Sequence, residues 1–114
     1  MTELVVSVTI DGLHFWPNAP EQYKEFGQPH RHLFKIICFY PTGDSSDPNR
    51  REKELWELRQ ETLDFIFNDW EILGSGAVDF GAMSCEGISD RIKDGMGFSK
   101  VFVGEEFWIG ALVT

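Results

Sequence analysis

The chain has 114 residues, with 19 acidic and 10 basic side chains, so its formal net charge is −9 when its three histidines are neutral. One core suffices for this length, and we expect a single domain over residues 1–114. A surface this acidic repels the phosphates of nucleic acids and anionic membranes, which argues against both as partners. The 42% of hydrophobic residues, with ten Phe, four Trp and two Tyr, indicate a packed globular core.

The sequence also indicates in which cell compartment the protein is expected. Its apolar runs are much shorter than the roughly 20 residues that span a bilayer. The segment Met1-Thr2-Glu3 lacks the basic flank of a signal peptide, so we expect a cytoplasmic protein. Cys38 and Cys85 lie far apart without CxxC spacing, and we expect both to be reduced core thiols.

The N-terminal part of the chain predicts two strands joined by a long loop. The even-numbered residues from Leu4 to Ile10 are apolar, which is the period-two alternation of a strand with one buried face. Residues 17–29 contain three prolines, an asparagine and a glycine, which predict a loop. Residues 30–40 are rich in β-branched and aromatic side chains and predict the second strand.

The rest of the chain predicts two helices and then two strands. Asp47 is suited to be the N-cap of a helix that starts at Pro48. Its core-facing stripe recurs at three-to-four spacing and comprises Leu55, Leu58, Thr62, Phe65, Ile66 and Asp69. A second helix is expected from Ser84 to Gly95, and strands are expected over 100–103 and 107–113. The order ββααββ predicts an α+β fold, with a four-stranded antiparallel sheet and two helices on one face.

All three histidines fall where the two N-terminal strands meet. His14 ends the first strand, and His30 and His32 open the second. Residues two apart on a strand face the same side, so His30 and His32 present two imidazoles to one place. Three imidazoles with an open fourth position are typical of a catalytic zinc site. The alternative is that His14 is a core histidine, because it shares the parity of the apolar face of its strand.

This pattern resembles the family of 6-pyruvoyltetrahydropterin and 6-carboxytetrahydropterin synthases, which has the T-fold. The match is carried by GLHFW and PHRHLFKI, and the resemblance implies that His14, His30 and His32 bind Zn²⁺. Arg31 replaces the usual glycine between the paired histidines. The resemblance spans nearly the whole chain and implies a homo-oligomer, a trimer or a hexamer, with a pterin bound at subunit boundaries.

The C-terminal segment VFVGEEFWIGALV resembles the part of the family that carries a pterin-anchoring glutamate. The resemblance places Glu105 in that role and leaves Glu106 as the alternative. A carboxylate can accept two parallel hydrogen bonds from the amino-pyrimidine edge of a pterin. Without the family context, Glu105 would be a solvated carboxylate in a turn.

Two catalytic residues are implied less directly. Asp69 matches the aspartate of an aspartate-histidine pair in the family, but Trp70 replaces the histidine. The family's nucleophilic cysteine is absent, and Glu25 lies close to its position, as in members that resemble aldolases acting on dihydroneopterin. A glutamate beside a metal can serve as a general base. The alternative is that Glu25 belongs to an exposed charged loop and has no role.

The sequence therefore leaves two hypotheses for function. The first is a zinc-dependent lyase that acts on the side chain of dihydroneopterin or its triphosphate, with Glu25 and Asp69 moving protons and Glu105 holding the ring. The second is a catalytically degenerate T-fold that keeps the zinc or pterin site and serves as a binding protein.

Overall fold

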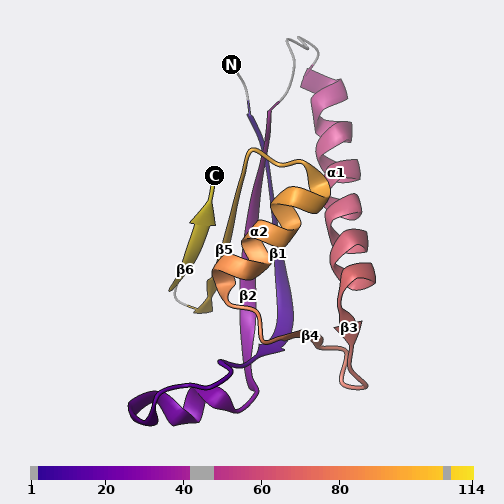
Figure 1. Cartoon of the computed structure of the whole chain (residues 1–114). Coiled ribbons are helices and arrows are strands. Elements are labelled where there is room, and N and C mark those ends of the chain that lie inside the picture. The colour runs from indigo at the N-terminus through magenta and orange to yellow at the C-terminus, as the bar shows by residue number, and fades with distance from the viewer. Residues whose placement is uncertain (1–2, 42–47, 107–108) are drawn as a thin grey trace.

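The computed structural model describes residues 3–41, 48–106 and 109–114 (Figure 1). Two long strands come first, β1 (Glu3–His14) and β2 (His30–Pro41), with the 3₁₀ helix η1 (Glu21–Gly27) between them. They are followed by α1 (Pro48–Asp69), β3 (Glu71–Ile72), β4 (Val78–Gly81), α2 (Cys85–Met96), β5 (Lys100–Glu105) and β6 (Ile109–Val113). The η1 segment lies beyond the ends of β1 and β2, at the bottom of Figure 1.

The strands form one sheet in the order β3-β4-β1-β2-β5-β6. The pairs β1–β2, β2–β5 and β5–β6 are antiparallel, whereas β4 runs parallel to the end of β1. The α+β class is thus confirmed. The prediction of a four-stranded antiparallel sheet with two helices is wrong, because the sheet is mixed, has six strands among the described residues, and is accompanied by η1 as well as α1 and α2.

The two unpredicted strands flank the Gly74-Ser75-Gly76 break. They turn back on each other through this segment, where Gly76 has a φ of 89° that favours glycine. Strands of two and four residues are too short to show a period-two pattern, so the sequence carried little signal for them. Their effect is to bring β4 beside the histidine-bearing end of β1.

The two α-helices have clear local reasons to form. The described part of α1 begins at Pro48, while the expected N-cap Asp47 lies outside the described residues. At the start of α2, the Ser84 hydroxyl accepts a hydrogen bond from the Gly87 N–H at 3.1 Å. This helix continues to Met96, one residue beyond the expected end, and stops at Gly97, whose φ of 74° is left-handed.

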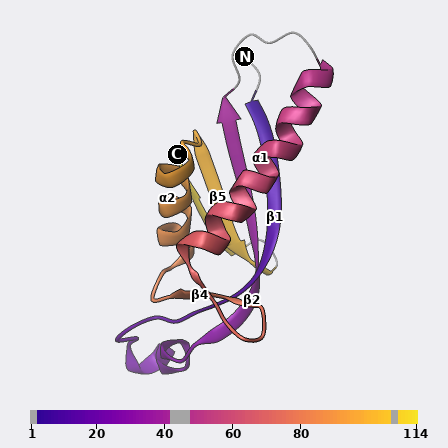
Figure 2. The same cartoon turned by 90° about the vertical axis from the view of Figure 1, so that its right-hand side faces the viewer.

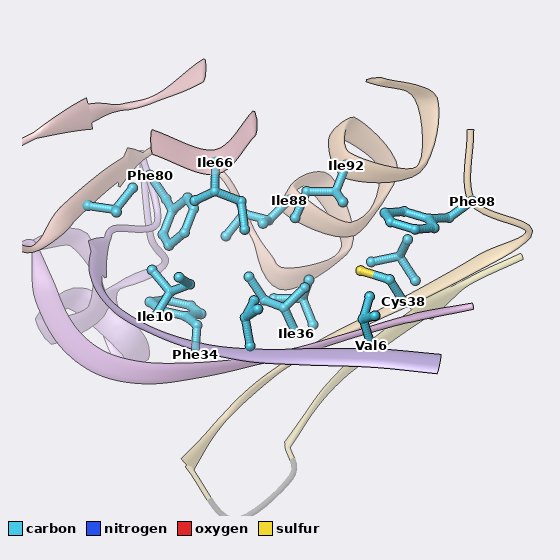
Figure 3. Packing of buried hydrophobic residues seen from close by; sticks show 14 residues of the cluster. Val6, Ile10, Phe34, Ile36, Cys38, Ile66, Phe80, Ile88, Ile92 and Phe98 are labelled. Atoms are coloured by element: carbon cyan, nitrogen blue, oxygen red, sulfur yellow. The ribbon is translucent and has the colours of Figure 1, made fainter. Parts of the chain in front are cut away.

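The core lies between one face of the sheet and the helices (Figure 3). The even-numbered residues of β1 are buried there, as are Phe34, Ile36 and Cys38 of β2, whereas Val5 and Leu33 on the other face are about half exposed. Ile66 of α1 and Ile88 of α2 belong to the same buried cluster, so both helices cover the same face. Figure 2 shows the two helices from another side. Burial of each such side chain contributes about 1.5–3 kcal/mol, which makes this cluster the main support of the sheet.

Cys38 and Cys85 are free thiols, as expected. Cys38 is fully buried in the core, and burial raises its pKa to about 12. Burial, together with the nearby Glu105 carboxylate, raises the pKa of Cys85 to about 11. Both therefore stay protonated near neutral pH. Within the described ranges, no helix has the length and hydrophobicity to cross a bilayer.

Candidate metal centre

The antiparallel pairing of β1 with β2 brings the three histidines together. His14 is paired directly with His30, and Gly12 with His32. The ring centroid of His14 lies 4.4 Å from that of His30 and 5.8 Å from that of His32, and the last two rings are 5.0 Å apart. The clustering predicted from strand parity is therefore confirmed.

The cluster lies on the helix-covered face, at the end of the sheet. His14 is buried, with 8% of its surface exposed, and its ring makes a T-shaped contact with that of Phe34 in the core. The pairing of β1 with β4 shifts register between Leu13 and His14. His14 is thus a core residue and a member of the cluster at once, so the two interpretations of its parity are compatible.

Arg31 faces away from the cluster, because it alternates with His30 and His32 along β2. Its Nε donates a hydrogen bond to Oδ1 of Asp11 at 2.7 Å, and a second guanidinium nitrogen contacts Oδ2 of the same carboxylate. These contacts lower the pKa of Asp11, with the side-chain hydrogen bond as the largest cause. Arg31 thus leaves the histidine side of the strand unaffected.

Two of the three imidazoles are oriented by backbone carbonyls. Nδ1 of His14 lies 3.0 Å from the Met83 carbonyl oxygen, and Nδ1 of His30 lies 3.1 Å from that of Gln28. A carbonyl only accepts hydrogen bonds, so Nδ1 carries the hydrogen in both rings. In the neutral rings this leaves the lone pair on Nε2, which is the arrangement that metal-ligating histidines commonly have.

Glu105, at the end of β5, completes the group. Its Oε1 lies 2.7 Å from Nε2 of His14, and its Oε2 lies 3.4 Å from Nε2 of His32. One potential ligand atom from each of His14, His30, His32 and Glu105 lies within 4.8 Å of all the others. Imidazole nitrogens with a carboxylate oxygen form a donor set that suits zinc.

The contact between His14 and Glu105 brings two potential acceptor atoms together. Nε2 of His14 is buried and has no partner in hydrogen-bond geometry, although the carboxylate oxygen is only 2.7 Å away. With Nδ1 protonated, a neutral ring would turn a lone pair toward another acceptor. A metal ion or a second proton on the imidazole removes this repulsion. The described residues therefore fit a bound cation.

His32 has a second carboxylate nearby. Its Nδ1 is buried without a hydrogen-bond partner and lies 3.7 Å from Oε2 of Glu106. The other oxygen of Glu106 accepts a hydrogen bond from the Leu33 N–H at 2.9 Å, beyond the point where β5 stops pairing with β2. Glu106 thus adds a hydrogen bond to β2 beyond the β2–β5 pairing, and its carboxylate lies beside Nδ1 of His32.

A cavity of about 380 Å³ opens beside the cluster. His14, His30 and Glu105 contribute its polar groups. The other residues that line it are mostly apolar and come from the segment between β1 and β2 and from the connection between β4 and α2: Phe15, Trp16, Pro17, Phe26, Ala82, Met83 and Ser84. A mostly apolar cavity of this size, with a few convergent polar groups, is typical of a small-molecule site.

Glu25 and Asp69, the expected catalytic residues, are not part of this group. Glu25 is exposed on η1 and does not line the cavity. Asp69 ends α1, where both of its oxygens accept hydrogen bonds from Arg91 of α2, at 2.7 and 2.5 Å. The Arg91 guanidinium keeps the pKa of Asp69 below its usual value of 3.8. The catalytic roles of Glu25 and Asp69 stay predictions.

Trp70, which follows Asp69, has a packing role. Its ring lies 5.0 Å from that of Phe80, and its Nε1 donates to the sulfur of Met83 at 3.2 Å. Met83 in turn holds His14 through its carbonyl. Trp70 therefore supports the backbone that orients His14 and brings no titratable group to the site.

The residues that hold and surround the histidines were not predicted from the sequence. Met83 and Gln28 act through backbone carbonyls, which no sequence pattern reveals. Phe26 lies in the predicted loop over residues 17–29 and Trp16 directly precedes it, and their aromatic character near His14 and His30 was the available signal. A scan of protein-family models finds none that matches this chain, and a search of curated proteins finds no significant match.

Proposed function

We propose that the chain binds Zn²⁺ through His14, His30 and His32 and acts on the side chain of a dihydropterin. The observation that carries the proposal is the convergence of three imidazoles and Glu105 within 4.8 Å, beside a cavity large enough for a small molecule. Zinc held by three histidines supplies Lewis acidity at an open coordination position. The carbonyls of Met83 and Gln28 support this by keeping two of the rings in the ligating tautomer.

The choice of a pterin rests on Glu105 and on the resemblance of the sequence. In this proposal the Glu105 carboxylate accepts two hydrogen bonds from the amino-pyrimidine edge of the ring. Its place on the cavity, next to His14, supports the idea that it meets a ligand. The same position would allow Glu105 to be a fourth metal ligand, which the glutamine variant described in the Discussion distinguishes.

The T-fold is part of the same proposal. The four expected strands, β1, β2, β5 and β6, are neighbours in the sheet and pair in antiparallel fashion, with both α-helices on one face. We treat β3 and β4 as additions to that unit. The segment of β1 before Gly12 has no strand on its outer side in the described part of the chain, and β6 forms the opposite edge. Two open edges support a homo-oligomer that joins subunit sheets, a trimer or hexamer.

The alternative is a binding protein that has kept the site but lost catalysis. Three features favour it: Trp70 cannot transfer a proton, Asp69 is held by Arg91, and Glu25 is outside the cavity. The metal cluster and the cavity do not depend on any of these residues. Binding without turnover is thus a coherent second function.

Product analysis separates the two functions. The zinc-loaded protein is incubated with dihydroneopterin and, separately, with its triphosphate, and the products are identified by chromatography and mass spectrometry. The enzyme hypothesis predicts release of the side chain or of triphosphate at a rate that the His30→Ala variant lacks. Unchanged compounds together with measurable binding would establish the binding protein. No binding of either compound would contradict the pterin proposal.

A further inference from the structure

The segment between β1 and β2, here called the arm, carries a row of three aromatic side chains, Trp16, Tyr23 and Phe26, that do not belong to the histidine cluster. The rings of Trp16 and Tyr23 are stacked, with their centroids 5.7 Å apart and their planes at 26° to each other. The centroid of the Phe26 ring lies 6.4 Å from that of Tyr23. All three are exposed by more than two fifths. Exposed rings of this size cost free energy in water, so their grouping calls for an explanation.

The row is fixed to the metal cluster. The backbone N–H of Trp16 donates a hydrogen bond to the backbone carbonyl of Phe26 at 2.8 Å, which joins the two ends of the arm. The Phe26 ring meets that of His30 at 5.7 Å, edge to face. Trp16 also follows His14 by only two residues. The aromatic row and the histidines are therefore linked by direct contacts.

Trp16 and Phe26 line the same cavity as His14, His30 and Glu105. The stack with Tyr23 covers one side of the Trp16 indole, and no other ring contacts it within the ranges that the structure describes. An indole in this position offers a flat, polarisable surface to a ligand in the cavity. Planar heteroaromatic rings bind to such surfaces by stacking, because each has a π-face whatever its substituents.

We infer that Trp16, supported by Tyr23 and Phe26, is the stacking surface for the planar ring of a heteroaromatic ligand whose side chain extends toward the histidine cluster. The inference rests on the proposed function and assigns the ring and the side chain of the ligand to different parts of the cavity. Trp16 contacts the face of the ring, Glu105 binds its amino-pyrimidine edge, and the histidines with their metal bind the oxygens of the side chain. A cavity of about 380 Å³ accommodates a bicyclic ring with a short side chain.

The test uses neopterin as the probe and two tryptophans that differ in position. Trp16→Leu removes the stacking surface, and Trp16→Phe keeps a smaller one. Trp56→Leu is the control, because Trp56 is exposed on α1 and borders a separate hollow next to Val5 and Arg59. The dissociation constant is measured by calorimetry on the zinc-loaded full chain, with zinc content and oligomeric state recorded for each variant.

We expect Trp16→Leu to raise the dissociation constant about tenfold, with Trp16→Phe close to wild type and Trp56→Leu unchanged. Zinc content should stay the same in all three. Unaltered binding by a zinc-loaded Trp16→Leu protein would overturn the inference and leave the proposed function intact. Unaltered binding with a changed oligomeric state would overturn it too, and would make the row an interface between copies. Failure of wild type to bind neopterin would instead contradict the proposed function and, with it, the ring subsite.

Discussion

Nε2 of His14 and Oε1 of Glu105 lie 2.7 Å apart, at the ends of two strands that do not pair with each other. β2 separates β1 from β5 in the sheet, and it supplies the other two histidines. The site thus depends on the common end of three strands. Because Glu105 contacts the histidines directly, its substitution is informative about both the metal and the ligand.

Glu105→Gln should separate metal binding from ring binding. The amide keeps the size of the side chain but loses the negative charge and one of the two acceptors, so neopterin binding should weaken at least about tenfold. Three imidazoles remain, so the protein should still hold about one zinc per chain. Metal analysis and calorimetry on the same sample check both. Zinc loss as complete as in His14→Ala would show that Glu105 is a metal ligand.

Glu25→Ala should abolish turnover of dihydroneopterin without releasing zinc, if Glu25 is the general base. Glu21→Ala is the matched control, since Glu21 is an exposed glutamate on the same short helix η1. Initial rates and zinc content are measured for both variants. Full activity of the Glu25→Ala protein would remove Glu25 from the mechanism.

Asp69→Asn should destabilise the protein through the loss of its pair with Arg91. A largely exposed pair of this kind contributes about 0.2–1 kcal/mol. Since Arg91 lowers the pKa of Asp69 in the fold, the contribution is present above the usual value of 3.8 and is lost as pH falls through the folded pKa. The free energy of unfolding in urea, measured at pH values above and below 3.8, tests this loss of stability, with Asp90→Asn on α2 as the control. A difference between wild type and Asp69→Asn that persists in strong acid would contradict the assignment.

Gly12→Ala should destabilise the protein by crowding the core. A β-carbon on Gly12 would lie 2.6 Å from Cε2 of Phe80 and 3.1 Å from Cδ2 of Phe34, and both rings are buried. Such overpacking costs about 1–3 kcal/mol. Gly74→Ala is the control, because nothing lies within 4 Å of its β-carbon. Thermal unfolding measures the difference; equal stability of both variants would mean that Phe80 can move at no cost.

The main strands and helices could be predicted because their patterns are long. The alternation from Leu4 to Ile10 and the helical stripe that includes Ile66 identify their buried faces over many residues. The pairing of β4 with β1 could not be predicted, because it is parallel, short and irregular at His14. Such contacts depend on packing between distant segments rather than on local preference.

The histidine cluster could be predicted because the first two strands were expected to be neighbours and because His30 and His32 share a side of their strand. The surroundings of the cluster could not. Asp69 shows the limit, because its helical position was correct but its carboxylate is bound to Arg91 of another helix. The orientation of His14 by Met83 likewise depends on the path of the chain between β4 and α2.

The central claim is that His14, His30 and His32 form a zinc site. Elemental analysis of the purified, zinc-loaded and dialysed protein tests it most directly, with the three single alanine variants beside it and Glu25→Ala as the control. We predict about one zinc per chain in wild type and Glu25→Ala, and a loss of most of the metal in each histidine variant. A wild-type protein without zinc, or histidine variants with as much zinc as wild type, would contradict the claim.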